Sequence, residues 1–180
     1  MKKSTLVLAA CLALAGPASA QSIGEKTGIN SALGVSPSTP DFIKQVAISD
    51  MFEIEAGNLA AQNADLTTKA FANKMVVDHT KTSAELKATV QNEPNAVIPE
   101  ALDSSHQSKL DKLKSLRGAD FIKEYRSQQV SAHKDAVSLF QRYASGGDNE
   151  RLKAWAAKTL PALQHHLEMA EKLSKERLGS

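Results

Sequence analysis

The residues of this sequence whose types could act together chemically are three histidines and two carboxylates on predicted helices. They are Asp50, Glu53, His79, His133 and His166. At 100° per residue, each falls within or at the edge of an arc of apolar residues, so its side chain is expected to point into the protein. Imidazole and carboxylate are ligands for zinc, copper and iron. The pattern therefore predicts a transition-metal site, with three histidines and one carboxylate on four facing helices.

A second interpretation uses the same residues without a metal. Buried histidines also bond neighbouring carboxylates or backbone carbonyls, and such a network, extended to Tyr125, would fix the register of the helices. The protein would then be a structural or stress-related component of the cell envelope. Replacing His79 by alanine separates the two hypotheses, because the first predicts loss of a metal and the second only a loss of stability.

Motifs for catalysis are lacking in the sequence. It has no glycine-rich phosphate loop, no His-Glu-x-x-His zinc-protease motif and no Gly-x-Ser-x-Gly nucleophile motif. No residue stands out as a nucleophile. We therefore assign no catalytic or cofactor-binding residue and favour a binding or structural protein over an enzyme.

Five stretches carry apolar residues at the 3.6-residue period of a helix. The predicted helices span residues 40–62, 66–91, 100–116, 119–144 and 149–178. No stretch shows the two-residue alternation of a half-buried strand. The predicted fold class is all-α, with one helical-bundle domain over residues 40–178.

The connections indicate how these helices pair. Only residues 63–65 separate the first two helices and residues 145–148 the last two, so each pair is expected to be antiparallel. Gly57 lies inside the first helix at a cost of about 1 kcal/mol relative to alanine, which indicates a close crossing. The helix over 100–116 has a thin apolar stripe and is predicted to be a surface or crossover helix, with His106 exposed to solvent.

The distance of each residue from the nearest tight turn gives its level along the bundle. At 1.5 Å per residue, Asp50, His79 and His133 lie roughly 20, 23 and 20 Å from their turns and are expected to share one layer. His166 lies roughly 29 Å from its turn. It joins that layer only through a kink at Pro161 or a stagger between helices, and otherwise belongs to a second site.

Residues 1–20 are predicted to be a signal peptide. Two lysines precede an apolar run over residues 4–16, and residues 18–20, Ala-Ser-Ala, form a small-residue cleavage site. The run is too short for a transmembrane helix. The protein is therefore expected in the periplasm, with cleavage and lipidation at Cys11 as the minor alternative.

The exported chain is expected to be electrically balanced. Two of the 22 basic residues and none of the 20 acidic ones lie in residues 1–20, which leaves 20 of each sign. This balance disfavours nucleic acid or an anionic membrane as a partner. The one cysteine also lies in that segment, so disulfides and thiolate metal ligands are not expected. Residues 21–39, rich in Ser, Gly, Asn, Thr and Pro, are predicted to form a flexible leader.

Four blocks of the sequence resemble a bacterial family of exported proteins that carry a domain of unknown function and are often labelled outer-membrane proteins. The blocks are residues 53–60, 71–79, 125–133 and 160–167. The resemblance implies a ferritin-like four-helix bundle with an extra crossover helix, while the role of the family is unsettled.

Ferritin-like di-iron centres use Glu-x-x-His on two of the helices. Here Val76 and Leu163 stand three residues before His79 and His166, in place of glutamate. A ferroxidase centre is therefore not expected.

Overall fold

The computed structural model describes residue 31, residues 33–93 and residues 96–176. These form the helices α3 (Thr39–Asn63), α4 (Leu66–Val90), α5 (Ser104–Ser115), α6 (Gly118–Gly146) and α7 (Glu150–Lys175). No strand occurs among the described residues. The prediction of an all-α fold is confirmed, and each predicted helix corresponds to one in the structure. The predicted signal peptide, with Cys11, lies outside the described residues.

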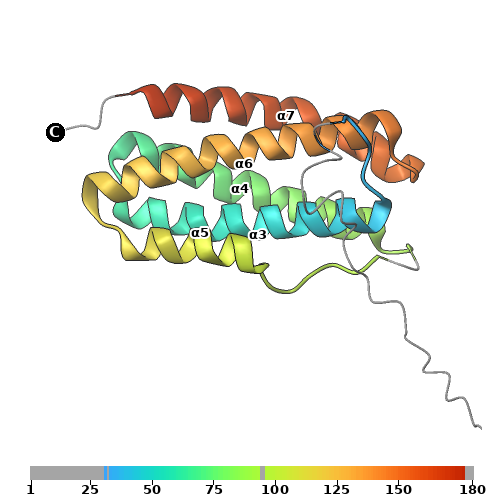
Figure 1. The fold of residues 1–180 in the computed structure, drawn as a ribbon, viewed down its shortest axis with the longest axis horizontal. Coiled ribbons are helices and arrows are strands. Elements are labelled where there is room, and N and C mark those ends of the chain that lie inside the picture. Colours follow the sequence, from blue (N-terminus) through green and yellow to red (C-terminus); the bar gives the residue numbers. More distant parts are fainter. Residues whose placement is uncertain (1–30, 32, 94–95, 177–180) are drawn as a thin grey trace, which may run out of the picture.

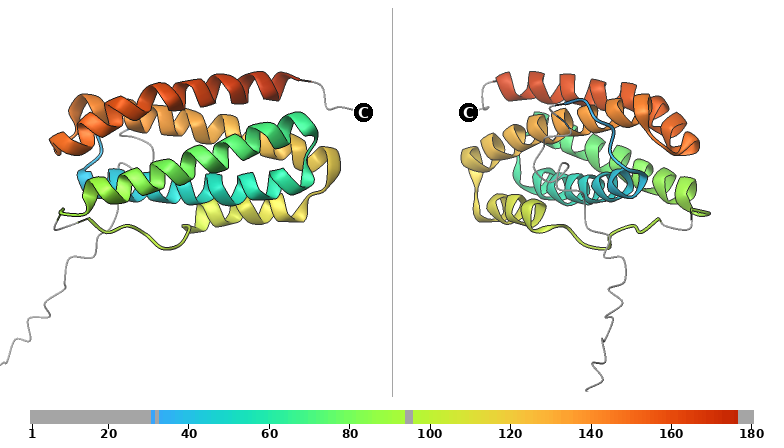
Figure 2. Two further views of the ribbon diagram at one scale, coloured as in Figure 1. Left: turned by 180° about the vertical axis from the view of Figure 1, so that it is seen from behind. Right: turned by 45° about the vertical axis from the view of Figure 1, so that its right-hand side comes forward.

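The four long helices form a bundle, and α5 lies in the connection between α4 and α6 (Figure 1). The closest pairs are α3 with α4 and α6 with α7, so the bundle is built from two antiparallel hairpins. The tight turn of the first hairpin and that of the second lie at opposite ends of the bundle in all the views (Figures 1 and 2). Each residue halfway along a long helix is therefore at mid-height.

Polar side chains cap the N-termini of four of the helices. The caps are Ser38, Asp65, Asp103 and Asn149, each accepting a bond from the backbone amide three residues on. The hydroxyl of Thr39, the first residue of α3, contacts the side chains of Tyr143 and Asp148. The helix α5 starts four residues later than predicted because Asp103 accepts the amide of His106 at 2.8 Å.

The imidazole of His106, predicted to be exposed, is half-buried. Its Nδ1 lies 2.8 Å from Oδ1 of Asp103, and its ring meets Phe52 edge-on at a centroid distance of 5.5 Å. The reason is that α5 packs against α3, which the thin apolar stripe of α5 did not indicate.

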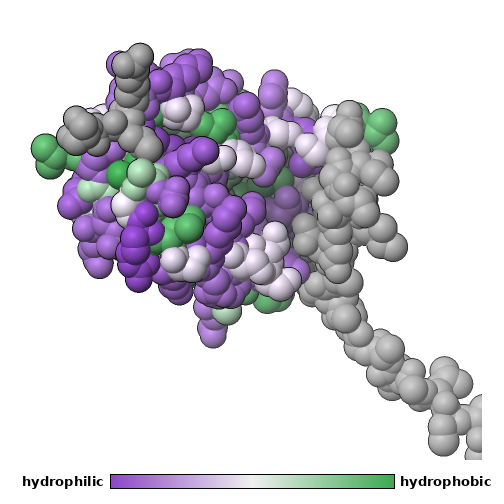
Figure 3. All heavy atoms as spheres, turned by 60° about the vertical axis from the view of Figure 1, so that its left-hand side comes forward, coloured by the Kyte–Doolittle hydropathy of each residue, from purple (hydrophilic) through white to green (hydrophobic). Residues whose placement is uncertain are grey.

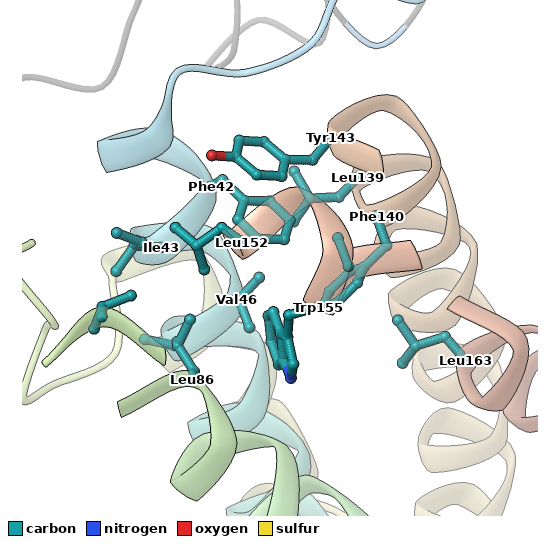
Figure 4. Close-up of a cluster of buried hydrophobic side chains, with 13 residues drawn as sticks. Phe42, Ile43, Val46, Leu86, Leu139, Phe140, Tyr143, Leu152, Trp155 and Leu163 are labelled. Atoms are coloured by element: carbon teal, nitrogen blue, oxygen red, sulfur yellow. The ribbon is translucent and has the colours of Figure 1, made fainter. Parts of the chain in front are cut away.

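The apolar core is divided into two clusters along the bundle. The first joins the start of α3, the end of α4 and the α6–α7 end, where Phe42 stacks on Tyr143 at 3.9 Å (Figure 4). The second joins the end of α3, the start of α4 and α5, and includes Phe52, Met75 and Tyr125. On every long helix the residues of one cluster precede those of the other. The middle of the bundle, between them, is left for polar side chains.

The face of the molecule in Figure 3 shows polar residues with apolar ones scattered between them. The exposed large apolar residues, Leu33, Val35, Leu66, Val77 and Val97, are spread over different segments. None of the helices in the described part of the chain is long and apolar enough to cross a membrane. The described part of the predicted leader contacts α6, where the Ser31 and Ser138 hydroxyls lie 3.0 Å apart.

Gly57 marks a close crossing of α3 and α4, as the sequence indicated. A Cβ atom at this position would lie 2.7 Å from Cγ2 of Val76 and 3.2 Å from the carbonyl oxygen of Ala72. The first distance is shorter than any normal carbon–carbon contact. The absence of a side chain is what lets the two helices approach here.

Replacing Gly57 by alanine is therefore expected to destabilise the protein, although alanine is the better helix former by about 1 kcal/mol. Overpacking of this kind costs about 1–3 kcal/mol, and we expect the clash to outweigh the gain in helix propensity. Urea denaturation would measure the change. A second replacement, Val76→Ala, should restore part of the stability, and a stabilised Gly57→Ala protein would contradict the packing shown here.

Candidate metal centre

Three histidines from three different helices meet in the polar middle of the bundle. His79 on α4, His133 on α6 and His166 on α7 are only 2%, 1% and 4% exposed. Their ring centroids lie 5.5–5.7 Å from one another. One nitrogen of each ring lies within 4.8 Å of one nitrogen of each of the others. His166 thus joins His79 and His133 in one cluster, called the three-histidine cluster below, and needs no second site.

In each of the three rings one nitrogen, called the outer nitrogen below, bonds a group outside the cluster. The outer nitrogen of His79 is held by Asp50 of α3. Nδ1 of His79 lies 2.8 Å from Oδ1 of Asp50. The same carboxyl group accepts bonds from the hydroxyls of Thr82, at 3.0 Å, and Ser83, at 3.2 Å. A carboxylate that accepts from all three leaves the hydrogen of His79 on Nδ1 and the lone pair on Nε2.

The outer nitrogens of the other two rings are fixed in the same way. Nδ1 of His133 lies 2.9 Å from the carbonyl oxygen of Gln129, which can only accept, so Nε2 carries the lone pair. Nε2 of His166 lies 2.7 Å from Oδ2 of Asp78, an oxygen that also accepts from Nζ of Lys74 at 2.8 Å. In His166 it is therefore Nδ1 that carries the lone pair.

In its neutral form, each ring is thereby left with one buried nitrogen that can only accept a hydrogen bond or bind a cation. These nitrogens, Nε2 of His79, Nε2 of His133 and Nδ1 of His166, have no hydrogen-bond partner among the described residues. Buried polar atoms without partners are costly. Three lone pairs facing one another are suited to a shared cation, and outer hydrogen bonds that orient the rings accompany histidine ligands in metal sites.

The pKa values of the three imidazoles differ because their surroundings differ. Burial lowers the pKa of His79, but the hydrogen bond to Asp50 and the negative charge of Glu53 outweigh it and raise the pKa above its ordinary value. Burial, with the positive charge of His79, lowers the pKa of His133. Burial, with the charges of His79 and His133, lowers the pKa of His166 to about 4. At neutral pH His133 and His166 are thus neutral and able to act as ligands, whereas a cation that binds His79 would displace a proton from its Nε2.

The shift at His166 gives the metal-free protein an expected dependence on pH. Between its ordinary value near 6.5 and about 4, the unfolded chain binds a proton that folded His166 does not. Lowering the pH through this range therefore favours unfolding. The raised pKa of His79 acts at higher pH, where it adds stability that is lost as the pH rises.

Urea denaturation of metal-free protein at pH 7 and pH 4.5 would measure the contribution of His166. The midpoint should fall more in the wild type than in His166→Gln, because glutamine does not titrate. Equal falls in the two proteins would show that His166 makes no such contribution.

The two carboxylates of the sequence hypothesis flank the cluster rather than share its centre. Asp50 contacts the outer side of His79. Glu53, on the same face of α3 and 1% exposed, has no hydrogen-bond partner for either oxygen within the described part of the chain. Its negative charge acts to raise the pKa values of His79, His133 and Tyr125.

Asp78 is a residue of the site that sequence reasoning missed. It is 100° round α4 from His79 and lies 2.8 Å from Lys74, as in an ordinary exposed helical ion pair. Nothing in the sequence distinguished it from such a pair. Only the position of α7 beside α4 brings it to His166.

The cluster is buried, but a cavity reaches its outer edge. The cavity has a volume of ≈ 800 Å³ and is lined by residues of α3 to α7, with Ser31 and Asp103. Asp50 and His79 are among its lining residues, with Lys44 and Lys109. Solvent and small ions therefore have a path to the Asp50–His79 pair.

No curated protein sequence matches the sequence of this chain. A solved structure described as "CopM in the Cu(II)-bound form" matches with a TM-score of 0.66, over 78% of this chain and 98% of that one, at 16% identity. At this identity the match shows a shared helical fold. The family described as "Domain of unknown function (DUF4142)" matches residues 24–173, most of the sequence. The chain therefore belongs to the DUF4142 family.

Proposed function

We propose that this protein binds a transition-metal ion through Nε2 of His79, Nε2 of His133 and Nδ1 of His166. The observation that carries the proposal is that each ring has its outer nitrogen bonded as a donor while the inner one is bare and buried. A cation satisfies all three inner nitrogens at once. A network that only fixed the packing of the helices would be expected to pair these atoms with donors.

The outer partners have a definite part in this proposal. Asp50, the carbonyl of Gln129 and Asp78 orient the three rings, and the two carboxylates increase the basicity of the imidazoles that they contact. Asp50 is thus assigned to orienting His79 rather than to binding the ion. Glu53, also predicted as a ligand from the sequence, lies beside the cluster with both oxygens unpartnered.

Copper is the first metal to test, followed by zinc and iron. A set of imidazole ligands accepts any of the three, and Cu(II) binds such sites most tightly among the common divalent ions. The protein of similar fold is described in a Cu(II)-bound form, which supports the same choice. With the signal peptide predicted from the sequence, the proposal is a periplasmic metal-binding protein without an assigned reaction.

The experiment that tests the proposal is the metal content of protein purified from the periplasm without an affinity tag, measured by mass spectrometry. We expect close to one Cu, Zn or Fe per chain in the wild type, and loss of that metal in His79→Ala. Removing the metal with a chelator should lower the melting temperature of the wild type, because a ligand that binds only the folded state stabilises it.

The structural hypothesis predicts a different pattern. The wild type would then contain no metal, its melting temperature would not respond to chelator, and His79→Ala would only melt earlier. Leaving Asp50 without its buried partner would cost about 1–3 kcal/mol. That pattern would overturn the proposed function.

A further inference from the structure

Beside the three-histidine cluster lies a second set of buried polar side chains without partners. Glu53, Tyr125 and Gln129 are 1%, 0% and 0% exposed. Both oxygens of Glu53, both amide atoms of Gln129 and the hydroxyl of Tyr125 have no hydrogen-bond partner among the residues that the structure describes. These five buried polar atoms can be satisfied only by a partner from outside the helices, because unpaired buried polar groups are costly.

These three side chains, called the polar compartment below, lie on one side of the cluster. Glu53 is one turn of α3 beyond Asp50, and Gln129 and Tyr125 are one and two turns of α6 before His133. Because α3 and α6 run in opposite directions, both displacements lead towards the α3–α4 turn (Figure 1). The negative charge of Glu53 acts on the pKa of Tyr125 as well as on the pKa values of His79 and His133.

The hydrogen-bonding capacity of the compartment indicates the chemical class of its occupant. As a carboxylate, Glu53 only accepts, and Gln129 adds one acceptor oxygen. The donors are the hydroxyl of Tyr125 and the amide group of Gln129. The three imidazole nitrogens are taken by the ion, but the lone pairs of the Glu53 carboxylate and the Gln129 carbonyl still outnumber the hydrogens of these donors. The occupant of the compartment should therefore be a small hydrogen-bond donor, and an anion should be disfavoured while Glu53 is charged.

We infer that Glu53, Gln129 and Tyr125 form a binding compartment for a small donor molecule, such as water, that occupies an open position on the ion held by the three histidines. The inference rests on the proposed function and deepens it. Structural zinc sites are closed by four protein ligands, whereas sites with three protein ligands keep a position for water or substrate. The polar compartment makes this a site of the second kind, able to bind exchangeable ligands.

The test uses Co(II) as the bound metal and azide as the probe, in the wild type, Glu53→Gln and Glu55→Gln. Co(II) content is measured first, and azide binding is then followed in the visible spectrum. Glu55 is exposed and two residues away on the same helix, so Glu55→Gln removes the same charge outside the compartment.

We expect all three proteins to hold Co(II). Glu53→Gln should bind azide about tenfold or more tightly than the wild type, because a buried negative charge beside the ion has been removed. Glu55→Gln should match the wild type. Loaded proteins whose spectra do not respond to azide would overturn the inference. A Glu53→Gln protein that is folded but loses Co(II) would also overturn it, because Glu53 would then be a metal ligand.

A second measurement needs no variant. In Cu(II)-loaded wild type transferred to D₂O, electron–nuclear double resonance should detect deuterons of an exchangeable ligand on the copper. Absence of that signal in loaded protein would overturn the inference. Failure of the wild type to bind Co(II) or Cu(II) at all would instead overturn the proposed function, so the two failures are distinguishable.

Discussion

Replacing His166 by alanine is expected to lower the affinity of the protein for Cu(II) at least about 100-fold, whereas replacing His165 should leave it unchanged. Loss of an outer partner alone typically costs 10–100-fold in metal affinity, and loss of a ligand should cost more. The imidazole of His165 is exposed, with Nδ1 3.9 Å from Oε2 of Glu168, and points away from the cluster.

The two variants form a matched pair because they remove the same side chain from adjacent positions of α7. Competition with a coloured chelator at fixed pH would measure both affinities, and circular dichroism would show that the helical content is retained. Equal affinities in the two variants would show that the three-histidine cluster is not the copper site. A comparable loss in His165→Ala would point to a surface site instead.

The helices and their pairing could be predicted from the sequence because both depend on local signals. Apolar residues recur at the helical period on α3, α4, α6 and α7. The short connections within each hairpin require its two helices to be antiparallel. The inward position of the three histidines followed from the same period. The crossing at Gly57 followed from a residue type that a helix interior otherwise disfavours.

Other features of the site depend on how separate helices lie relative to one another. Counting residues from a turn assumes straight helices that start at the same level. On that assumption His166 lies too far along the bundle to share the layer of His79 and His133. Asp78 was missed because its contact is with α7, and the burial of His106 because its contact is with α3. Such long-range contacts leave no periodic signal in a single sequence.

A polar middle between two apolar clusters means that the folding of this bundle and its chemistry depend on different residues. The clusters at the two ends bury Phe42 and Trp155 on one side and Phe52 and Phe121 on the other. Replacements in the three-histidine cluster should therefore affect binding more than folding. Replacements of residues that hold the ends of the helices together should instead affect folding more than binding. Among these residues Arg126 makes the most hydrogen bonds.

Replacing Arg126 by methionine is expected to destabilise the protein by about 3–5 kcal/mol. The side chain is buried on α6. Its Nη2 donates to Oδ2 of Asp65, the cap of α4, at 2.9 Å, and its Nε to the hydroxyl of Thr68 at 3.0 Å. Its Nη1 donates to the carbonyl oxygens of Leu173 and Glu176 at the end of α7, both at 2.9 Å. One guanidinium group thus holds the start of α4 and the end of α7 to α6.

Methionine fills much of the same volume but leaves these acceptors without their donor, which is why the loss should exceed that of an ordinary surface replacement. Guanidinium denaturation would give the free energy of unfolding. Arg151→Met is the control, because Arg151 is exposed and makes one long bond, 3.2 Å, to the carbonyl of Thr89. Arg126→Lys should recover only part of the stability, since an ammonium group cannot reproduce the planar fork of donors.

Copper affinity should remain that of the wild type in the folded Arg126→Met protein, because Arg126 lies two helical turns from His133 and contacts none of the three histidines. A loss of stability below about 1 kcal/mol would mean that the network behaves as an exposed ion pair.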